Sequence, residues 1–132
     1  MKPEYKRIPF RKLKKMDYNP ESPKYIEIKG IPRAVQFHIF GKKFEERYNY
    51  STNFFLQKNK NLVYVYNHNS RDHHQNIKEQ LLKTASEGNL EIDVRGLFEG
   101  SGSRLGYTSI YWYELAIDGC VLERDSNNPE EV

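Results

Sequence analysis

Histidine and cysteine often bind metals or act in catalysis, and the sequence contains four histidines and one cysteine. His68, His73 and His74 lie close together, and Cys120 is the lone cysteine. A structural zinc site needs about four ligands at fixed spacing, and no paired cysteine motif supplies them. No histidine or asparagine pattern marks Cys120 as a nucleophile. We therefore expect solvated histidines, an unreactive thiol and no metal site.

Carboxylates and a glycine-rich segment offer two further kinds of chemistry. Glu91 and Asp93 are two residues apart, and the segment EIK, residues 27–29, has the carboxylate–lysine spacing of some metal-dependent nucleases but no upstream aspartate. The segment GSGSRLG, residues 100–106, lacks the Lys-Ser/Thr ending of a phosphate-binding loop, and a strand pattern follows it. The sequence therefore predicts a protein that is not an enzyme and has no cofactor, with a nuclease as the less favoured alternative.

Basic residues are concentrated in the N-terminal half of the chain. Residues 1–60 contain 15 Lys and Arg against 6 Asp and Glu, whereas residues 61–132 contain 6 against 12. The densest basic run is KRIPFRKLKK, residues 6–15. Such asymmetry indicates a basic arm or face for a polyanion. The alternatives are a solvated tail without a partner, and an arm held by the acidic surface of this chain or of a neighbouring copy.

Length and composition limit the class of protein. A chain of 132 residues suits one domain, and an aromatic share of 14% argues against a disordered chain. No apolar run approaches the roughly 20 residues of a membrane span, and the N-terminus has no signal-peptide pattern. One cysteine cannot form an internal disulfide. We expect a cytoplasmic protein with no membrane partner, of a size that suits phages and mobile elements.

The pattern of apolar residues predicts a mainly β fold with one helix. Residues 1–23 are interrupted by prolines and are expected to be irregular. Apolar residues at helical spacing, including Leu82, predict a helix over residues 73–87, with Asp72 as its N-cap and Gly88 after its end. Alternating patterns predict strands over residues 24–40 (bent at 30–32), 50–57, 62–66, 90–96 and 107–119.

This order of elements resembles the oligonucleotide/oligosaccharide-binding fold, or OB-fold. That family has a five-stranded Greek-key barrel, with a helix between strands three and four. The segments LEIDVRG and YWYELAIDG, separated by a glycine-rich loop, resemble the end of such a domain. The resemblance implies a barrel domain over residues 24–124, a basic irregular arm over 1–23 and a polar tail over 125–132. The irregular stretch 44–52 departs from a minimal barrel.

The OB-fold resemblance also implies where a ligand binds. The family commonly uses strands two and three, together with the loops between strands one and two and between strands four and five. Positive side chains there follow phosphates, and flat rings stack on bases at about 1–3 kcal/mol each. This implies largely sequence-independent binding of single-stranded DNA or RNA, in replication, recombination or repair. The candidate binding residues are Lys42, Lys43, Arg47, Tyr48, Tyr50, Phe55, Lys58, Lys60, Tyr64, Tyr66, Arg104 and Tyr107.

Strand alternation predicts which of these side chains face outward. Val63 and Val65 are expected in the core, so that Tyr64 and Tyr66 point outward, where they can stack on bases. In the last strand the same rule places Tyr113 inward. Outward tyrosines also suit a protein interface, because tyrosine is common in binding hot spots. A protein–protein adaptor, or a homo-oligomer, is therefore the alternative to a nucleic-acid binder.

Acidic residues on the last two strands oppose phosphate binding. Glu91, Asp93, Glu114 and Asp118 fall on predicted outward positions, and like charges repel. Nucleic-acid binding therefore requires that they lie away from its path. Trp112 is expected on the same outward face, where packing is favoured over a stacking role.

Overall fold

The computed structural model describes residues 3–42, 47–69, 71–101 and 106–124, and it describes side chains outside residues 37–50 and 69–74. In chain order its elements are β1 (Lys6–Arg7), the 3₁₀ helix η1 (Phe10–Lys15), β2 (Tyr25–Lys42), β3 (Arg47–Lys58), β4 (Asn61–Asn69), α1 (Arg71–Ser86), β5 (Ile92–Gly100), β6 (Ser109–Ile117) and β7 (Cys120–Glu123).

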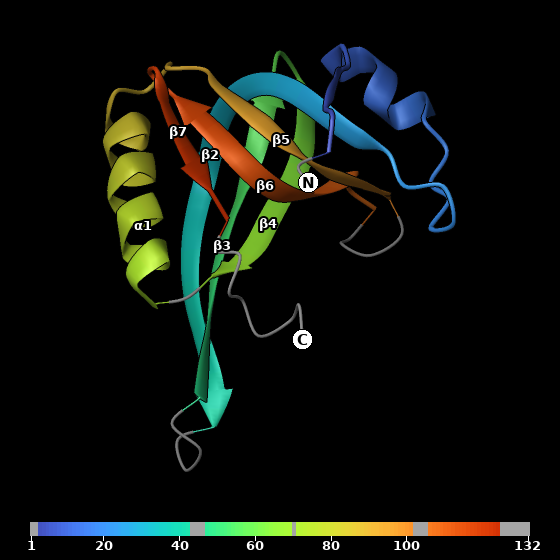
Figure 1. The fold of residues 1–132 in the computed structure, drawn as a ribbon. Helices are drawn as coiled ribbons and strands as arrows, with labels where there is room; N and C mark the ends of the chain where they lie inside the picture. Colours follow the sequence, from blue (N-terminus) through green and yellow to red (C-terminus); the bar gives the residue numbers. More distant parts are fainter. Residues whose placement is uncertain (1–2, 43–46, 70, 102–105, 125–132) are drawn as a thin grey trace.

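A closed five-stranded barrel forms the centre of the molecule (Figure 1). β2 pairs antiparallel with β5 up to Gly30 and with β3 beyond it, which confirms the change of direction predicted at residues 30–32. β3 pairs with β4, and β6 closes the barrel by lying antiparallel to β5 and parallel to β4. The order β2-β3-β4-β6-β5, with α1 between β4 and β5, confirms the predicted mainly β, OB-like architecture.

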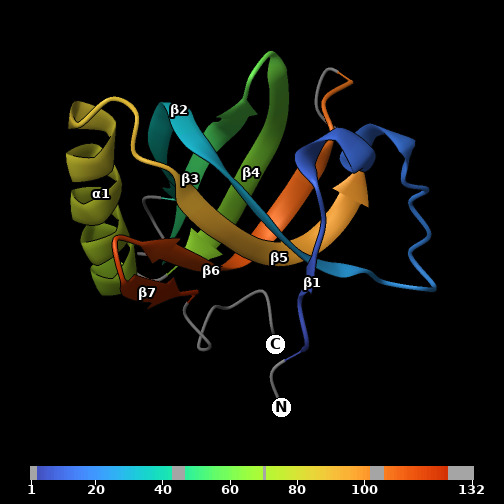
Figure 2. The same ribbon diagram turned by 90° about the horizontal axis from the view of Figure 1, so that it is seen from above.

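The barrel interior and one face of α1 form the hydrophobic core. Val63 and Val65 point into it, as predicted. α1 lies at one end of the barrel (Figure 2), where Ile77 and Leu81 are fully buried. Thr84 is the next buried position, because helical geometry aligns residues at spacings of three and four. Leu82, predicted to join this face, is exposed. No helix in the described part of the chain is long and apolar enough to cross a membrane.

The structure corrects the start of the helix and confirms its end. α1 begins at Arg71, so Asp72 lies inside the helix and is not its N-cap. The polar residues of the first turn carry no periodic signal that alternation or helical spacing could detect. After the helix, Gly88 has a φ of +84°, the left-handed value that a glycine at this position adopts most easily.

Two tight turns connect neighbouring antiparallel strands. Lys58 pairs with Asn61 across the β3–β4 hairpin, which joins the two strands predicted over residues 50–57 and 62–66. Asp118 and Gly119 have φ values of +46° and +82°, as in a type I′ turn, and they lead into β7, which pairs with β6. β7 was not predicted, although an Asp-Gly pair between two apolar runs is a hairpin signal.

A β-bulge in β6 reverses the predicted orientation of its aromatic residues. Arg95 of β5 pairs with Glu114, but the next residue, Gly96, pairs with Trp112, so Tyr113 is the extra residue. A bulge shifts the alternation by one residue. Trp112 therefore points into the core and is fully buried, whereas Tyr113 lies outside and is half-buried. The predicted faces of both residues were wrong, while the packing role favoured for Trp112 is confirmed.

The N-terminal segment is more ordered than its prolines indicate. β1 pairs parallel with β2, with Lys6 opposite Ile26. η1 buries Phe10 and Leu13 in the core, whereas its lysines remain exposed. Figure 2 shows this segment lying across the barrel. The two apolar side chains attach the basic run to the barrel, so its charges are held beside the sheet.

Candidate functional site

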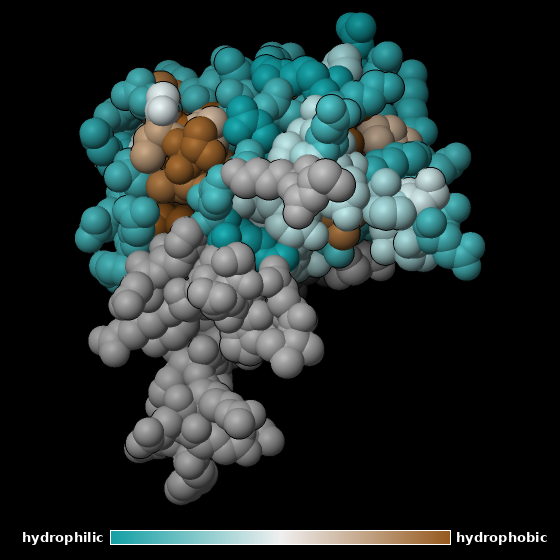
Figure 3. Space-filling view, viewed as in Figure 1, coloured by the Kyte–Doolittle hydropathy of each residue, from teal (hydrophilic) through white to brown (hydrophobic). Residues whose placement is uncertain are grey.

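Aromatic rings form a continuous row across the outer surface of the barrel. Neighbouring ring centroids are 4.9–6.4 Å apart, and contacts lead from Tyr5 through β2, β6 and β4 to Phe55 on β3. In Figure 3 part of this face is a pale area of intermediate hydropathy. We call this row the aromatic stripe. Its members are Tyr5, Tyr25, Tyr113, Tyr111, Tyr66, Tyr64, Phe55 and Tyr107.

Strand alternation and the β6 bulge together build the aromatic stripe. Tyr64 and Tyr66 alternate with the core valines of β4. Val65 of β4 pairs with Ile110 of β6, and Tyr66 pairs with Tyr111. Tyr111 and Tyr113 share a face because they are two residues apart, and the bulge turns this face outward although Leu115 and Ile117 point inward. A second pair of tyrosines therefore continues the row. The register of the parallel β4–β6 pair is therefore what brings the two tyrosine pairs together.

The members of the stripe differ in how much of each ring a ligand could reach. Tyr64 points outward as predicted, but only 8% of its surface is exposed. Phe55 and Tyr66 cover it, with ring centroids 5.5 and 5.6 Å away. Stacking by Tyr64 is therefore not supported, because its neighbours occupy the space a base would need. Tyr66, Tyr111 and Tyr113 are half-buried and keep accessible surface.

A cation lies over the centre of the stripe. The guanidinium of Arg124 is 5.1 Å from the ring centroid of Tyr111 and 5.2 Å from that of Tyr113, a cation–π geometry. Burial raises the pKa of Tyr113, and the nearby Arg124 opposes this shift only in part. The Tyr113 hydroxyl therefore remains a neutral hydrogen-bond group at neutral pH. Arg124 supplies positive charge beside rings suited to stacking.

Tyr66 is held in place by a carboxylate. Its hydroxyl donates a hydrogen bond to Oε1 of Glu99, on β5. Burial, and then this hydrogen bond, raise the pKa of Tyr66 well above its usual value. The phenol is therefore protonated at all physiological pH values, and its ring orientation is fixed.

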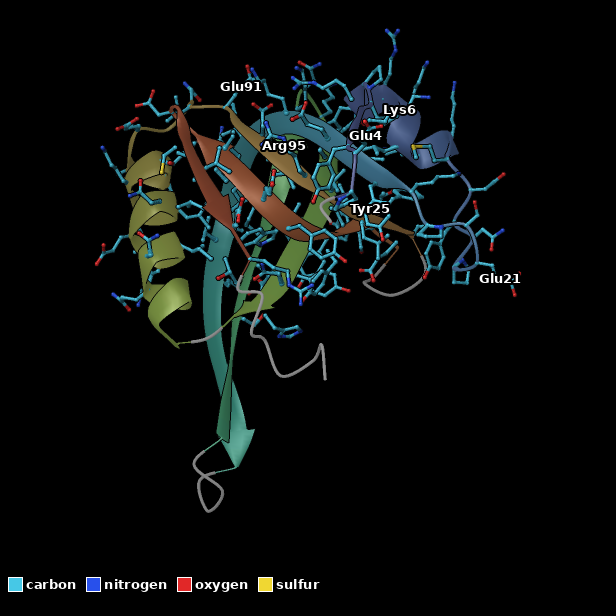
Figure 4. All side chains as sticks on the ribbon, viewed as in Figure 1. Glu4, Lys6, Glu21, Tyr25, Glu91 and Arg95 are labelled. Atoms are coloured by element: carbon cyan, nitrogen blue, oxygen red, sulfur yellow. The ribbon has the colours of Figure 1, made fainter. Side chains whose placement is uncertain are left out.

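Most of the acidic residues expected to repel phosphate are engaged in ion pairs. Arg95 donates to Glu27 and, at 3.2 Å, to Glu114. Arg7 lies 2.7 Å from Glu27 and 3.1 Å from Asp93. Figure 4 shows Arg95 on the outer face of β5. These pairs reduce the negative charge of the face, and they confirm the alternative that the acidic surface holds part of the basic arm of the same chain.

Glu27 is the centre of this ion-pair network. Burial would raise the pKa of its carboxyl, but hydrogen bonds from Arg7 and Arg95 outweigh burial and hold the pKa below its usual value. The same hydrogen bond raises the pKa of Arg7. Each partner therefore stays charged at neutral pH, and the network attaches β1 to β2 and β5.

Replacing Arg7 with alanine is expected to loosen β1 while lowering the free energy of unfolding by less than about 1 kcal/mol, since Arg7 is half exposed. Hydrogen exchange at the Ile8 amide, which donates to the backbone carbonyl oxygen of Glu27 at 3.0 Å, should become faster. In the wild type, acidification through the lowered pKa of Glu27 should have the same effect, because the pair is lost on protonation. Lys6→Ala is the matched control, and an equal effect there would contradict this role of Arg7.

Some of the other predicted binding residues lie in or beside the aromatic stripe, and one forms an ion pair. Phe55 and Tyr107 belong to the stripe and lie 4.9 Å apart. Lys60, in the β3–β4 turn, lines a surface hollow of about 380 Å³ together with Tyr107 and Lys14 of η1. Lys58 instead pairs with Glu91 at 3.6 Å, so a free phosphate contact is not supported for it.

The remaining predicted residues belong to the two loops that the OB-fold resemblance implies for ligand binding. Lys43 and Arg104 lie outside the described residues. Lys42, Arg47, Tyr48 and Tyr50 lie where the backbone extends the β2–β3 pairing, with Lys42 opposite Arg47 and Ile39 opposite Tyr50. The side chains of these four residues are outside the described set. Sequence reasoning missed Tyr25, Tyr111, Tyr113, Glu99 and Arg124. The two closely spaced tyrosines of the segment YWY, residues 111–113, were the sequence signal that could have pointed to this site.

The described geometry defines an OB-like barrel with an aromatic outer face, and comparison with solved structures agrees on the fold. A protein assigned as an aspartyl-tRNA synthetase, from Leishmania major Friedlin, matches with a TM-score of 0.52 and 11% sequence identity. The match covers 95% of this chain and 22% of the synthetase chain. No protein-family model and no curated protein matches the sequence. At this identity the likeness shows the fold alone.

Proposed function

We propose that this protein binds single-stranded DNA or RNA without catalysing a reaction, and that the aromatic stripe is its stacking surface. The observation that carries the proposal is the row of contacting rings with Arg124 over its centre. Single-strand binders combine aromatic platforms with positive charge along the backbone path. The OB-like barrel is compatible with this role. Cytoplasmic replication, recombination or repair is the setting we propose.

Charge on the barrel supports a particular path for the strand. The ion pairs of Arg7 and Arg95 compensate Asp93, Glu114 and Glu27 near the Tyr25 end of the stripe. At the other end, Tyr107 borders the hollow that Lys14 and Lys60 line. Phosphates are attracted to these lysines, so the strand would run along the stripe towards the hollow.

Replacing Tyr111 with alanine is expected to weaken binding to a labelled single strand by about 1–3 kcal/mol, the usual loss per stacked base. Fluorescence anisotropy with oligo-dT, single-stranded RNA and duplex DNA across a salt series measures this. Wild-type affinity should favour single strands and fall steadily with salt, since phosphate contacts release counterions.

Tyr18→Ala is the control for this substitution, because Tyr18 is 51% exposed and is outside the stripe. Its affinity should equal that of the wild type. Equal losses in the two variants, or equal binding of single strands and duplex, would contradict stacking on the stripe. A folded protein that binds none of the three probes would favour the protein–protein adaptor, because half-buried tyrosines beside an arginine also suit a protein interface.

A further inference from the structure

Glu99 occupies an unusual position in the barrel wall. Phe98 pairs with Ile110 and Gly100 pairs with Ser109, so Glu99 is the extra residue of a second β-bulge. Bulges redirect side chains and are common beside functional sites. Here the Glu99 carboxylate lies on the outward face of β5 and accepts a hydrogen bond from the hydroxyl of Tyr66, in the middle of the aromatic stripe. The side chain is only half-buried, so a ligand on the stripe could reach it.

Glu99 differs from other acidic residues of this face, whose charges are compensated by ion pairs with arginine. Glu27, Asp93 and Glu114 each pair with an arginine. Within the described ranges, the only hydrogen-bond partner of Glu99 is the neutral phenol of Tyr66, and no cation forms an ion pair with it. A carboxylate offers about four lone-pair sites, of which Tyr66 uses one. Acceptor capacity therefore remains for a ligand.

We infer that Glu99 gives the stripe a preference for guanine, accepting hydrogen bonds from the Watson–Crick edge of a base stacked beside it. This inference rests on the proposed function and specifies its base preference. A phosphate would be repelled by the carboxylate, whereas a base edge that donates hydrogen bonds would be attracted. Single-stranded ligands expose these edges to proteins.

Guanine is the base whose donors match a carboxylate. It presents two adjacent donors, N1–H and the N2 amino group, to the two carboxylate oxygens. Adenine and cytosine present one amino group beside a ring-nitrogen acceptor, and thymine and uracil present one N–H between two carbonyl oxygens. These acceptors would face the second oxygen of Glu99 and repel it. A paired set of hydrogen bonds to a base favours that base over the others by about tenfold or more.

The test compares base preference in wild type and Glu99→Gln. The probes are labelled 12-mers of oligo-dT, alternating dT-dG and alternating dT-deoxyinosine, measured by anisotropy. The wild type should bind dT-dG about tenfold more tightly than oligo-dT, with deoxyinosine in between because it lacks the N2 amino group. The side-chain oxygen of glutamine can still accept the hydrogen bond from the Tyr66 hydroxyl. The other end of its amide is a donor, which cannot accept a hydrogen bond from guanine. The tenfold preference should therefore be lost.

Glu91→Gln is the charge-matched control, because it also removes one negative charge but Glu91 pairs with Lys58 and is not a contact of the stripe tyrosines. It should keep the guanine preference, whatever its effect on overall affinity. Single-strand binding without preference in the wild type, or a preference that survives Glu99→Gln, would overturn the role of Glu99 and leave the stripe as a general binding surface. Binding to none of the probes would overturn the proposed function and this inference with it.

Discussion

Replacing Trp112 with alanine is expected to lower the free energy of unfolding by about 3–5 kcal/mol. Trp112 is the largest fully buried side chain and lies in the barrel core with Phe54 and Phe98. Its removal leaves a cavity that a closed barrel cannot fill by small shifts, because hydrogen bonds on both edges fix the strands. Urea denaturation followed by circular dichroism measures the loss.

The Trp112→Phe variant distinguishes the effect of losing side-chain volume from the effect of losing the buried indole N–H. The indole Nε1 is buried without a hydrogen-bond partner among the described residues. Phenylalanine keeps an aromatic ring and removes that N–H, so this variant should lose much less stability than the alanine variant. A loss below about 1 kcal/mol in Trp112→Ala would instead fit an outward tryptophan, as simple alternation in the last strand predicts.

Replacing Gly96 with alanine is expected to cost about 3 kcal/mol, the upper end for overpacking a well-packed site. A Cβ at this position would lie 2.3 Å from the carbonyl oxygen of Tyr111 and 2.7 Å from the Cα of Trp112. Both are backbone atoms, so no side-chain rotation relieves the contact. β5 and β6 must separate beside the bulge, and their amides should exchange faster with solvent.

Gly88→Ala controls for adding a methyl group to a glycine. A Cβ there meets nothing within 4 Å, and the cost comes from its φ of +84°. That strain is worth about 1–2 kcal/mol and should leave exchange in β5 and β6 unchanged. If Gly96→Ala left β5 and β6 equally protected, the close approach of these strands would not be the reason for glycine at this position.

The barrel could be predicted because its strands follow simple rules. Ile26, Ile28, Val63 and Val65 alternate as half-buried strands require, and the structure buries all of them. The order of strands around one helix then indicated the architecture. The bulges could not be predicted, because a bulge depends on how two strands meet and leaves no regular pattern in either. That is why Trp112 was assigned to the wrong face.

The candidate site was predictable in composition and less so in arrangement. Phe55, Tyr66 and Tyr107 were identified as aromatic surface residues, and all three belong to the stripe. Their partners Tyr111 and Tyr113 were missed, since β6 reaches β4 only through a parallel pairing between segments distant in sequence. Local periodicity carries no information on such a pairing. Glu99 was missed for a related reason, because its contact with Tyr66 joins β5 to β4, two segments distant in sequence.

β6 has consequences for how the chain can fold during synthesis. It pairs with β5 along one edge, and with β4 and β7 along the other. Until this strand leaves the ribosome, β4 and β5 have unpaired edges and the tyrosines of β4 lack their β6 neighbours. Exposed edges favour association with other chains, and pairings between distant segments form slowly. The synthesis of β6 therefore determines when a nascent molecule stops being prone to aggregation.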